Sequence, residues 1–272
     1  MDEDLIFADN FDALMSESLY RHCTHALCQA GEVSFHMAGE SFRMREGDCI
    51  ILTHNELVSD LKQTDDFKAT VLYIANSFAH ENLPRNDYDV IGKLTLLRNP
   101  VMALAADERE TFLDDVRQLK KRLESGTHRF QHELIGCLTE VFILDLYDFH
   151  ARIYERPAVS EQSALLLDRF IELLRTGEYQ THREVAYYAS RLFITPKYLT
   201  EICKKVSGYH ANFWIDRFTI TGITRLLSNK NLTLKEISDR MNFSSISYFS
   251  RYVHRMLKVT PSEYRNNIRQ EA

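Results

Sequence analysis

The sequence lacks the features of a membrane, secreted or disulfide-bonded protein. No run of residues approaches the roughly 18 apolar residues that span a bilayer. The opening stretch, MDEDLIFADNF, is acidic and has no basic segment of the kind that begins a secretory signal. The cysteines are odd in number, scattered and without a CxxC spacing; they are Cys23, Cys28, Cys49, Cys137 and Cys203. We therefore predict a cytoplasmic protein with reduced thiols and no membrane partner.

The sequence also lacks the motifs that hold most metals and cofactors. It contains no phosphate loop, no dinucleotide-binding glycine pattern and no nucleophile elbow. No HxH pair occurs, since His22 and His25 are three positions apart and His36 stands alone on a predicted strand. A metal site needs several converging ligands, so we expect His22, His36 and His54 to be polar-face or hydrogen-bonded core residues. We predict no enzyme activity, no cofactor and no metal.

Positive charge is outnumbered by negative charge overall but is concentrated at one end of the chain. The 272 residues carry 33 Lys and Arg against 39 Asp and Glu, a net charge of −6. From Pro157 onward there are 17 Lys and Arg against 11 Asp and Glu, a balance of +6, which leaves −12 for the preceding part. A basic module attached to an acidic one is typical of phosphate binding. Chance segregation of solvated charges is the alternative.

A short pattern that occurs twice between Thr181 and Arg265 is the most informative feature present. YLTE followed by KK, from Tyr198 to Lys205, is answered 50 positions later by YFSR followed by HR, from Tyr248 to Arg255. Two copies are too few for a solenoid, which needs about three or more repeats. A tandem pair of helix-turn-helix units therefore fits the pattern better.

Local signals predict where the helices of this region begin and end. The S/T-x-x-E spacing of Thr181 with Glu184, and of Thr233 with Glu236, is typical of a helix start. A proline after an N-cap residue predicts further starts, and a glycine predicts an end. These signals are Thr195-Pro196, Thr260-Pro261 and Gly208.

Each of the two predicted recognition helices, near 196–206 and 246–256, has an apolar and a polar face. The apolar stripes are Leu199, Ile202, Cys203 and Val206, and Phe249, Tyr252, Val253 and Met256. The polar faces are rich in donors, as a helix in a major groove requires. Between them, Tyr209 to Ser228 contains no proline and predicts a linker helix of about 28 Å. Successive major grooves on one face of DNA lie about 34 Å apart.

The segments YLTEICKKVSG and FSSISYFSRYVHRMLKVTPSEYR resemble the C-terminal domain of the AraC/XylS transcriptional regulators. The resemblance covers about residues 165–267, and it implies an all-α DNA-binding domain at 163–267 with two helix-turn-helix units joined by a long linker helix. The sequence departs from the family pattern at three places. Asn242-Phe243 stands where Gly-Phe is usual, Val253-His254 stands where Phe-Lys is usual, and Lys258 replaces the usual glycine before the Thr-Pro pair. Asn adopts a left-handed backbone more readily than most residues, so we expect the second turn to survive. Losing the usual Phe-Lys at Val253-His254 is expected to weaken phosphate attraction.

Before the repeat, from about Leu19 to Ser77, the pattern is that of short strands. The clearest are 33–37, 41–44, 49–52 and 67–74. Their spacing predicts a small sandwich or barrel. The regulator family commonly carries a cupin-like sensory β-barrel here, which implies a cupin-like β domain at 1–98 and an α+β chain. A small-molecule effector would bind inside it, and the sequence nominates no residue for that site.

Two amphipathic helices are predicted between the β domain and the repeat. Asp107 to Glu124 has one apolar stripe and stops at Gly126, and Phe130 to Phe149 follows. In the regulator family a helical pair at this position dimerises, which implies a dimerisation region at 99–155 and a homodimer. The alternative is that both stripes pack against the β domain. Arg156 to Gln162 is the predicted linker, and Leu165 to Leu174 the first helix after it.

The resemblance, carried over by position, nominates residues for contact with double-stranded DNA. The base-facing residues are Lys197, Thr200, Glu201, Ser247, Ser250 and Arg251. The phosphate-facing residues are Thr195, Lys204, Lys205, Ser245 and Arg255. Arg251 best suits bidentate reading of guanine, and cations and helix starts suit phosphates. Alternatively, Glu201 forms a surface charge pair with a nearby lysine, and the lysines are simply solvated. Tyr198 and Tyr248, and Phe213 with Trp214, are expected to serve packing.

We therefore predict a sequence-specific transcriptional regulator that reads two adjacent major grooves. Its N-terminal part would sense an effector or dimerise, and RNA polymerase would be a further partner. Two other classes stay open: a cupin-type metal enzyme with an appended helical domain, and a helical module that binds protein. A bound metal would favour the first alternative, and DNA binding that falls steeply with salt would exclude the second.

Overall fold

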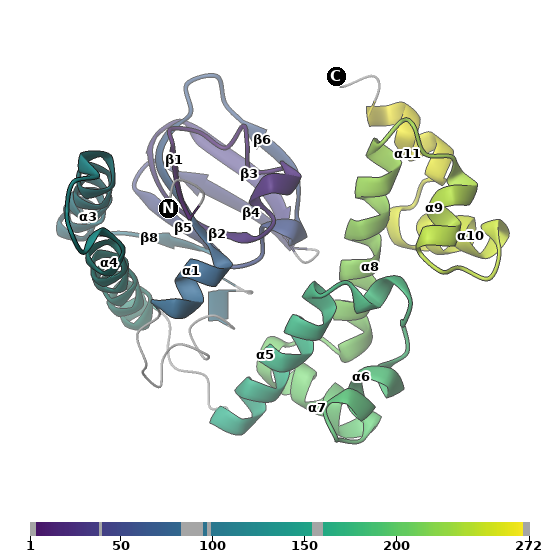
Figure 1. The fold of residues 1–272 in the computed structure, drawn as a ribbon. Helices are drawn as coiled ribbons and strands as arrows, with labels where there is room; N and C mark the ends of the chain where they lie inside the picture. The colour runs from purple at the N-terminus through teal and green to yellow at the C-terminus, as the bar shows by residue number, and fades with distance from the viewer. Residues whose placement is uncertain (1–3, 38–39, 83–94, 97–98, 154–159, 269–272) are drawn as a thin grey trace. The chain divides into compact units, whose positions relative to one another are not determined.

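The architecture was taken from a computed structural model that describes residues 4–37, 40–82, 95–96, 99–153 and 160–268. The chain divides into two compact units, Met1–Ala164 and Leu165–Ala272. The first contains the strands and the second contains only helices among its described residues (Figure 1).

The strands of the first unit form two antiparallel sheets (Figure 1). The larger sheet has the order β1 (Leu5–Ala8), β7 (Lys68–Ala75), β2 (His22–Ala30), β5 (Asp48–Leu52), β8 (Val101–Ala103). The smaller sheet has the order β4 (Glu40–Arg45), β3 (Glu32–Met37), β6 (Val58–Gln63). Two short 3-10 helices, η1 (Glu17–Leu19) and η2 (Asn55–Leu57), lie between strands. The predicted α+β class is therefore confirmed.

The pairing corrects the predicted closed barrel. The described strands form two separate sheets, and this agrees with the sandwich that the strand spacing equally allowed. Cupin-like ancestry of this unit stays a prediction. Four strands were not given individual bounds. β2 lies within the predicted strand region, β1 and β8 are short edge strands outside it, and β6 (VSDLKQ) carries alternating polar residues on an edge of the smaller sheet.

The centre of the larger sheet is buried on both faces. Along β7, Leu72 and Ile74 join an apolar cluster with residues of the helices α3 (Ala106–Ser125) and α4 (Gln131–Ile153). Side chains alternate along a strand, so Val71 and Tyr73 point to the opposite face, and both are also fully buried. Residues buried on both faces give the near-continuous apolar run from Val71 to Ala75.

The helices of the first unit cover one face of the larger sheet. A short helix, α1 (Asn76–Glu81), follows β7, and α3 and α4 come after β8. The rings of Phe112 in α3 and Phe142 in α4 meet edge to face with centroids 5.3 Å apart. Both helices begin or end close to the predicted bounds, and Gly126 ends α3 in a left-handed conformation (φ 56°). The alternative that the apolar stripes of both helices pack against the β domain is therefore observed for these inner residues.

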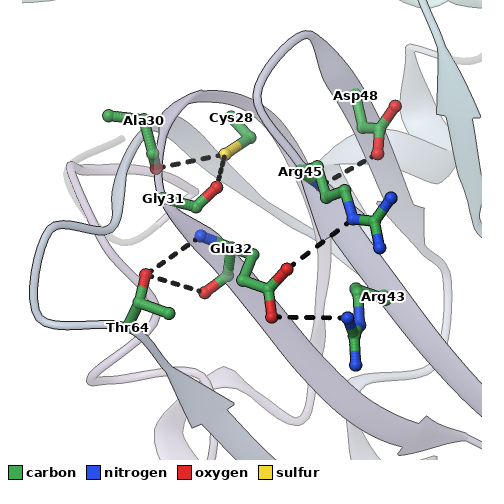
Figure 2. A network of polar contacts seen from close by, with 8 residues as sticks. All are labelled: Cys28, Ala30, Gly31, Glu32, Arg43, Arg45, Asp48 and Thr64. Carbon is green, nitrogen blue, oxygen red and sulfur yellow. Dashed lines mark hydrogen bonds and ion pairs between the residues drawn. The ribbon is translucent and has the colours of Figure 1, made fainter.

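A polar network fixes the hairpin of the smaller sheet (Figure 2). The carboxylate of Glu32 lies 3.6 Å from both the Arg43 and the Arg45 guanidinium nitrogens, and its backbone N–H donates to Thr64 Oγ1 at 3.0 Å. These ion pairs are largely exposed and stabilise little. The Thr64 bond, in contrast, ties β3 to the end of β6 beside the turn.

Gly31 lies at the start of this network, between β2 and β3 (Figure 2). It has a positive φ of 68°, and a Cβ atom there would lie 2.8 Å from the backbone Cα of Phe67. Both the conformation and the space require glycine at this turn. Nearby, burial raises the pKa of the Cys28 thiol to about 11, and the thiol donates to the carbonyls of Ala30 and Gly31.

The second unit is a succession of short helices around one longer helix. They are α5 (Glu161–Arg175), η3 (Glu178–Gln180), α6 (Val185–Arg191), α7 (Pro196–Ser207), α8 (Ala211–Ser228), α9 (Leu234–Arg240), α10 (Ile246–Leu257) and α11 (Pro261–Ile268). α8 is the predicted linker helix, and its 18 residues span about 27 Å. It carries α6 and α7 at one end and α9, α10 and α11 at the other (Figure 1).

Two helix starts differ from the prediction. Thr181 does not begin α6, because it ends η3 and Glu184 is the N-cap residue. The S/T-x-x-E spacing occurs there, but Thr181 and both residues between it and Glu184 lie before the start of the helix. The first helix of the unit begins at Glu161, before the predicted Leu165. The predicted linker at 156–162 falls mostly outside the described residues.

Candidate nucleic-acid interface

Two helix-turn-helix units are present, α6 with α7 and α9 with α10. Their turns have the same backbone geometry, with Phe193 (φ 57°) and Asn242 (φ 49°) in the left-handed region. In the first turn Ile194 N–H donates to Ala189 O at 3.0 Å, and in the second Phe243 N–H donates to Ser238 O at 2.9 Å. The second turn survives the replacement of glycine by Asn242, as predicted. Phe193 is the corresponding residue of the first turn and is 95% exposed.

The recognition helices begin in the same way. Thr195 Oγ1 accepts from Tyr198 N–H and Ser245 Oγ accepts from Tyr248 N–H, each at 3.2 Å. The first cap was predicted from the Thr-Pro pair, and it satisfies one of the free amides at a helix start. Elsewhere the predicted capping box of Thr233 is also present.

The recognition helices also end alike. Gly208 (φ 83°) and Lys258 (φ 63°) both adopt the left-handed conformation, and their N–H groups donate to carbonyls four residues earlier. Lys258 therefore occupies the conformation that usually favours glycine. The repeat is thus preserved in backbone geometry even where its residues change.

The first recognition helix, α7, presents a polar face away from its buried stripe. The predicted inner residues of this helix are all buried. Lys197 and Glu201 are exposed and Thr200 is partly exposed. Lys197 Nζ lies 3.9 Å from Glu201 Oε1, so the alternative of a surface charge pair is realised in the unbound protein. The Thr200 hydroxyl donates to Pro196 O at 2.9 Å and leaves its oxygen free to accept a further bond.

The second recognition helix, α10, also separates a buried face from a polar one. Phe249, Tyr252 and Val253 are buried, while Met256, predicted to be buried, is partly exposed. Ser247 and Arg251 are exposed and Ser250 is partly exposed. The six predicted base-facing residues therefore lie on the outer sides of two equivalent helices. Their contact with bases stays a prediction.

The predicted phosphate-facing residues are exposed as well, with one unexpected contact. Thr195, Lys204, Lys205 and Ser245 are exposed at the starts or last turns of the two helices. Arg255 is exposed but tied inward: its Nη2 atom lies 3.9 Å from Asp216 Oδ1 and its guanidinium 4.9 Å from the Tyr252 ring centroid. No local pattern in the sequence predicts this contact with α8.

α8 forms the core of the unit through its aromatic residues, as expected for Trp214. This residue is fully buried and donates through Nε1 to Ser207 Oγ at 2.9 Å. Phe213 is partly exposed and stacks on Tyr209 at 4.0 Å. At the second unit, Tyr252 donates its hydroxyl to Asp216 Oδ1 at 2.7 Å. Side-chain hydrogen bonds therefore anchor both recognition helices to α8.

Arg183 was not predicted from the sequence, and it connects the two helix-turn-helix units. Its guanidinium donates to the backbone carbonyls of Met241 at 2.7 Å and Asn242 at 2.9 Å. The partners are 58 and 59 residues away. No local pattern predicts such a pairing.

The histidines and acidic groups of the described ranges form no cluster of three or more that could hold a metal ion. His22 and His54 are buried, and His54 Nδ1 lies 3.2 Å from Glu56 Oε1. His36 is exposed and its Nε2 lies 2.9 Å from Ser41 Oγ. No described helix is both long and apolar enough to cross a bilayer.

Several known proteins share parts of this arrangement. Residues 188–267, which include both recognition helices, match the family model described as "Helix-turn-helix domain". The regulatory protein PocR of Salmonella typhimurium is 29% identical over 84 residues, which make up 31% of this chain and 28% of PocR. The match therefore spans less than a third of that relative.

Solved structures resemble a larger part of the chain. The structure of ToxT from Vibrio cholerae aligns with 90% of this chain and 90% of its own, with a TM-score of 0.51 and 16% identity. Wild-type ToxT with a bound unsaturated fatty acid aligns with 90% of this chain and 86% of its own, with a TM-score of 0.50 and 15% identity. At such identity the likeness shows the fold alone.

Proposed function

This chain carries an AraC-type helix-turn-helix domain, and we propose that it is a sequence-specific DNA-binding transcriptional regulator that reads two adjacent major grooves. The observation that carries the proposal is the pair of equivalent recognition helices, α7 and α10, whose outer faces are exposed within one compact unit. A basic balance in this part of the chain supports binding to an anionic backbone.

Within this proposal the side chains divide into readers and anchors. Arg251 is exposed and its side chain makes no hydrogen bond or ion pair with the other described residues, so its planar fork is free to donate to both acceptors of a guanine. Ser247 and Ser250 adjoin it on the same face, and in α7 Lys197, Thr200 and Glu201 take the equivalent places. Binding of Lys197 to a base would release Glu201 to accept from a cytosine amino group.

Anchoring falls to the helix starts and to the cations in the last turns. Thr195 and Ser245 place the free amides of α7 and α10 toward phosphate. Lys204 and Lys205 add charge without sequence preference. Arg255 would keep its contacts with Asp216 and Tyr252 and present its remaining donors to the DNA phosphates. The second helix-turn-helix unit would therefore be held to DNA less by charge than the first.

The proposal is tested by comparing Arg251→Ala with Lys205→Ala on a duplex selected by the wild-type protein from a random pool. Arg251→Ala should cost about 1–3 kcal/mol on that duplex and relax preference at one base position. Lys205→Ala should weaken binding to all sequences alike and reduce the slope of log K against log salt by about one. Fluorescence anisotropy at several salt concentrations measures both effects.

Arg169→Ala is the matched control, because Arg169 is an exposed cation on α5 outside the proposed interface. Equal losses for Arg169→Ala and Arg251→Ala, with sequence preference intact, would reject base reading by Arg251. Absence of any salt-dependent duplex binding by the wild-type protein would reject the DNA-binding proposal and favour a protein-interaction module.

We further propose that the first unit binds a small effector between its two sheets. ToxT, whose fold aligns with most of this chain, has been solved with an unsaturated fatty acid bound. In this chain Tyr73 is fully buried on the face of β7 that points away from α3 and α4, and its hydroxyl has no hydrogen-bond partner among the described residues. A buried polar group normally has a hydrogen-bond partner, and we propose that the effector supplies it here.

We propose that α4 also forms a homodimer through its outer side. Phe130, just before the helix, is 57% exposed, Val141 48% and Leu144 42%, and Cys137 is exposed as well. With the partly exposed Leu134 these positions repeat with the alternating spacing of four and three residues that typifies a coiled-coil seam. A dimer would present two DNA-binding units, and RNA polymerase would meet the complex at the promoter.

A further inference from the structure

The segment between η3 and α6 precedes the first helix-turn-helix unit and contacts the turn of the second. Arg183, two residues before α6, donates from Nη1 to Met241 O at 2.7 Å and from Nη2 to Asn242 O at 2.9 Å. Nη1 also donates to Gln180 O at 3.0 Å within its own segment. The guanidinium stacks on the Phe243 ring, with its carbon 4.2 Å from the centroid. One side chain therefore joins both units.

The contacts suit the chemistry at the end of a helix. α9 ends at Arg240, so the carbonyls of Met241 and Asn242 lie just beyond it, where backbone acceptors lack intrahelical partners. The end of a helix also carries partial negative charge. A guanidinium can bridge two carbonyls and stack on a ring at once because it is planar and has five donors. A lysine ammonium has no such fork.

Two further contacts hold the same segment in place. Asn242 Nδ2 donates to Thr181 O at 3.3 Å, so the link is made from both sides. Tyr179 is buried against the middle of α8, where a Cβ on Gly222 would come within 2.8 Å of its ring. Gly222 thus lets the segment approach α8 closely as it passes from one unit to the other.

We propose that Arg183 is a positioning residue that fixes the spacing of the two recognition helices, with no contact to DNA itself. The inference rests on the proposed function and adds a determinant of its specificity. Without Arg183, α10 stays attached through Tyr252 to Asp216, and α11 through Arg265 Nε, which donates to Leu227 O at 3.1 Å. Both of these bonds reach only α8. Without Arg183 the second helix-turn-helix unit therefore keeps its anchorage to α8, while its link to the first loses the Arg183 bonds and keeps the longer 3.3 Å bond from Asn242 Nδ2 to Thr181 O.

The consequence for binding follows from effective concentration. When one reader has docked, the second meets its groove at a local concentration set by how rigidly the two are joined. A fixed spacing favours duplexes whose half-sites match it and disfavours those with altered spacing. Loosening the tie spreads the second reader over more positions, which weakens the matched duplex and helps the mismatched ones.

The first test measures the spacing without DNA. Spin labels at Lys204→Cys and His254→Cys, in a full-length Cys137→Ser background, lie on equivalent exposed positions of α7 and α10. Pulsed electron spin resonance should give one narrow distance distribution for the protein with Arg183. Arg183→Ala should lose that narrow peak, and Arg169→Ala should keep it. Identical distributions with and without Arg183 would overturn the inference, whether or not the protein binds DNA.

The second test uses DNA and no labels. The probes are the duplex selected by the wild-type protein and versions with one or two base pairs inserted between its half-sites. Arg183→Ala should bind the parent duplex about tenfold more weakly, within the range typical of coupling between sites. It should also discriminate less against the inserted versions, with each half-site's base preference unchanged. A uniform loss on every duplex would show a phosphate contact and overturn the positioning role.

Asn242→Gly provides a second variant in case Arg183→Ala does not fold. It removes the side-chain bond to Thr181 and retains the left-handed backbone that the turn needs. A smaller shift in the same direction in both tests supports the inference, and an unchanged spacing profile contradicts it. Failure of the wild-type protein to bind any duplex would reject the proposed function, while the label distances would still decide the role of Arg183.

Discussion

The hydroxyl of Tyr73 is a buried donor in the first unit that has no hydrogen-bond partner among the described residues. It lies on the central strand pair of the larger sheet, and its burial together with the charge of Asp12 raises the pKa of Tyr73 well above its ordinary value. The hydroxyl therefore stays protonated and able to donate. Leaving such a donor unpaired costs free energy, and a protein that binds an effector there recovers that cost when the ligand arrives.

Tyr73→Phe should therefore stabilise the ligand-free protein by about 1 kcal/mol, because it removes a buried donor that has no partner. Oleate, as a first effector probe, should raise the melting temperature of the wild-type protein more than that of the variant. Thermal unfolding followed by circular dichroism measures both. A variant that is less stable than wild type, with an equal response to oleate, would contradict a role for this hydroxyl.

The left-handed residues show how single positions preserve the repeat. Asn242 and Lys258 replace glycine at a turn and at a helix end, and both keep the positive φ that the backbone requires. Phe193 does the same in the first turn with an exposed ring. Each such residue costs of order 1 kcal/mol in backbone strain, and the neighbouring caps and buried stripes outweigh it. The survival of the second turn was predicted because asparagine adopts a left-handed backbone more readily than most residues.

At the scale of elements, α3 and α4 share an acidic contact that makes their packing sensitive to pH. Burial, the charge of Asp145 on α4 and the charge of Asp114 raise the pKa of Asp115 on α3 to about 7. An unfolded aspartate titrates at about 4. The folded protein thus holds this proton up to about pH 7, so the associated stability is present at low pH and is lost as pH rises from about 4 to 7.

Asp115→Asn should raise the melting temperature at pH 8 by a few degrees, about 3 °C, because it removes a like-charge contact. It should also flatten the decline in melting temperature between pH 4 and 7. Glu124→Gln is the control, since Glu124 is an exposed acidic residue of α3 whose charge does not contribute to the raised pKa of Asp115. Calorimetry at several pH values is the measurement, and identical pH profiles for wild type and Asp115→Asn would disprove the assignment.

The elements themselves were predictable where their signals are local. α3, α7, α8 and α10 lie within a few residues of the predicted bounds, because caps, glycine stops and apolar stripes are read within one helix. The start of α6 was misplaced since Thr181 and Glu184 have the right spacing but belong to different turns. The edge strands β1 and β8 were missed because three or four residues carry too little pattern.

For the whole molecule, the exposed seam on α4 predicts assembly. An apolar stripe with coiled-coil spacing is stable in water when a second copy covers it. Leu144→Glu places a charge in this seam and should weaken self-association at least about tenfold, as expected for burying an unpaired charge. Sedimentation equilibrium measures the dissociation constant.

Glu140→Ala is the matched control for this assembly, because Glu140 is an exposed residue of α4 that lies outside the seam. It should leave the dissociation constant unchanged. A monomeric wild-type protein at tens of micromolar, or equal behaviour of Leu144→Glu and wild type, would exclude α4 as the dimer interface and leave its stripe as a surface feature.

The sequence by itself predicted the α+β class and the tandem helix-turn-helix design, because strand spacing, periodicity, capping and repetition act over a few residues. Its family resemblance nominated the residues that would face DNA, and their contact with DNA stays a prediction. Only the tertiary structure decided that the strands form two sheets, that Arg183 ties the two readers together and that Arg255 leans on Asp216. Each of these joins residues tens of positions apart, and the free energy of such a contact depends on packing that no local pattern encodes.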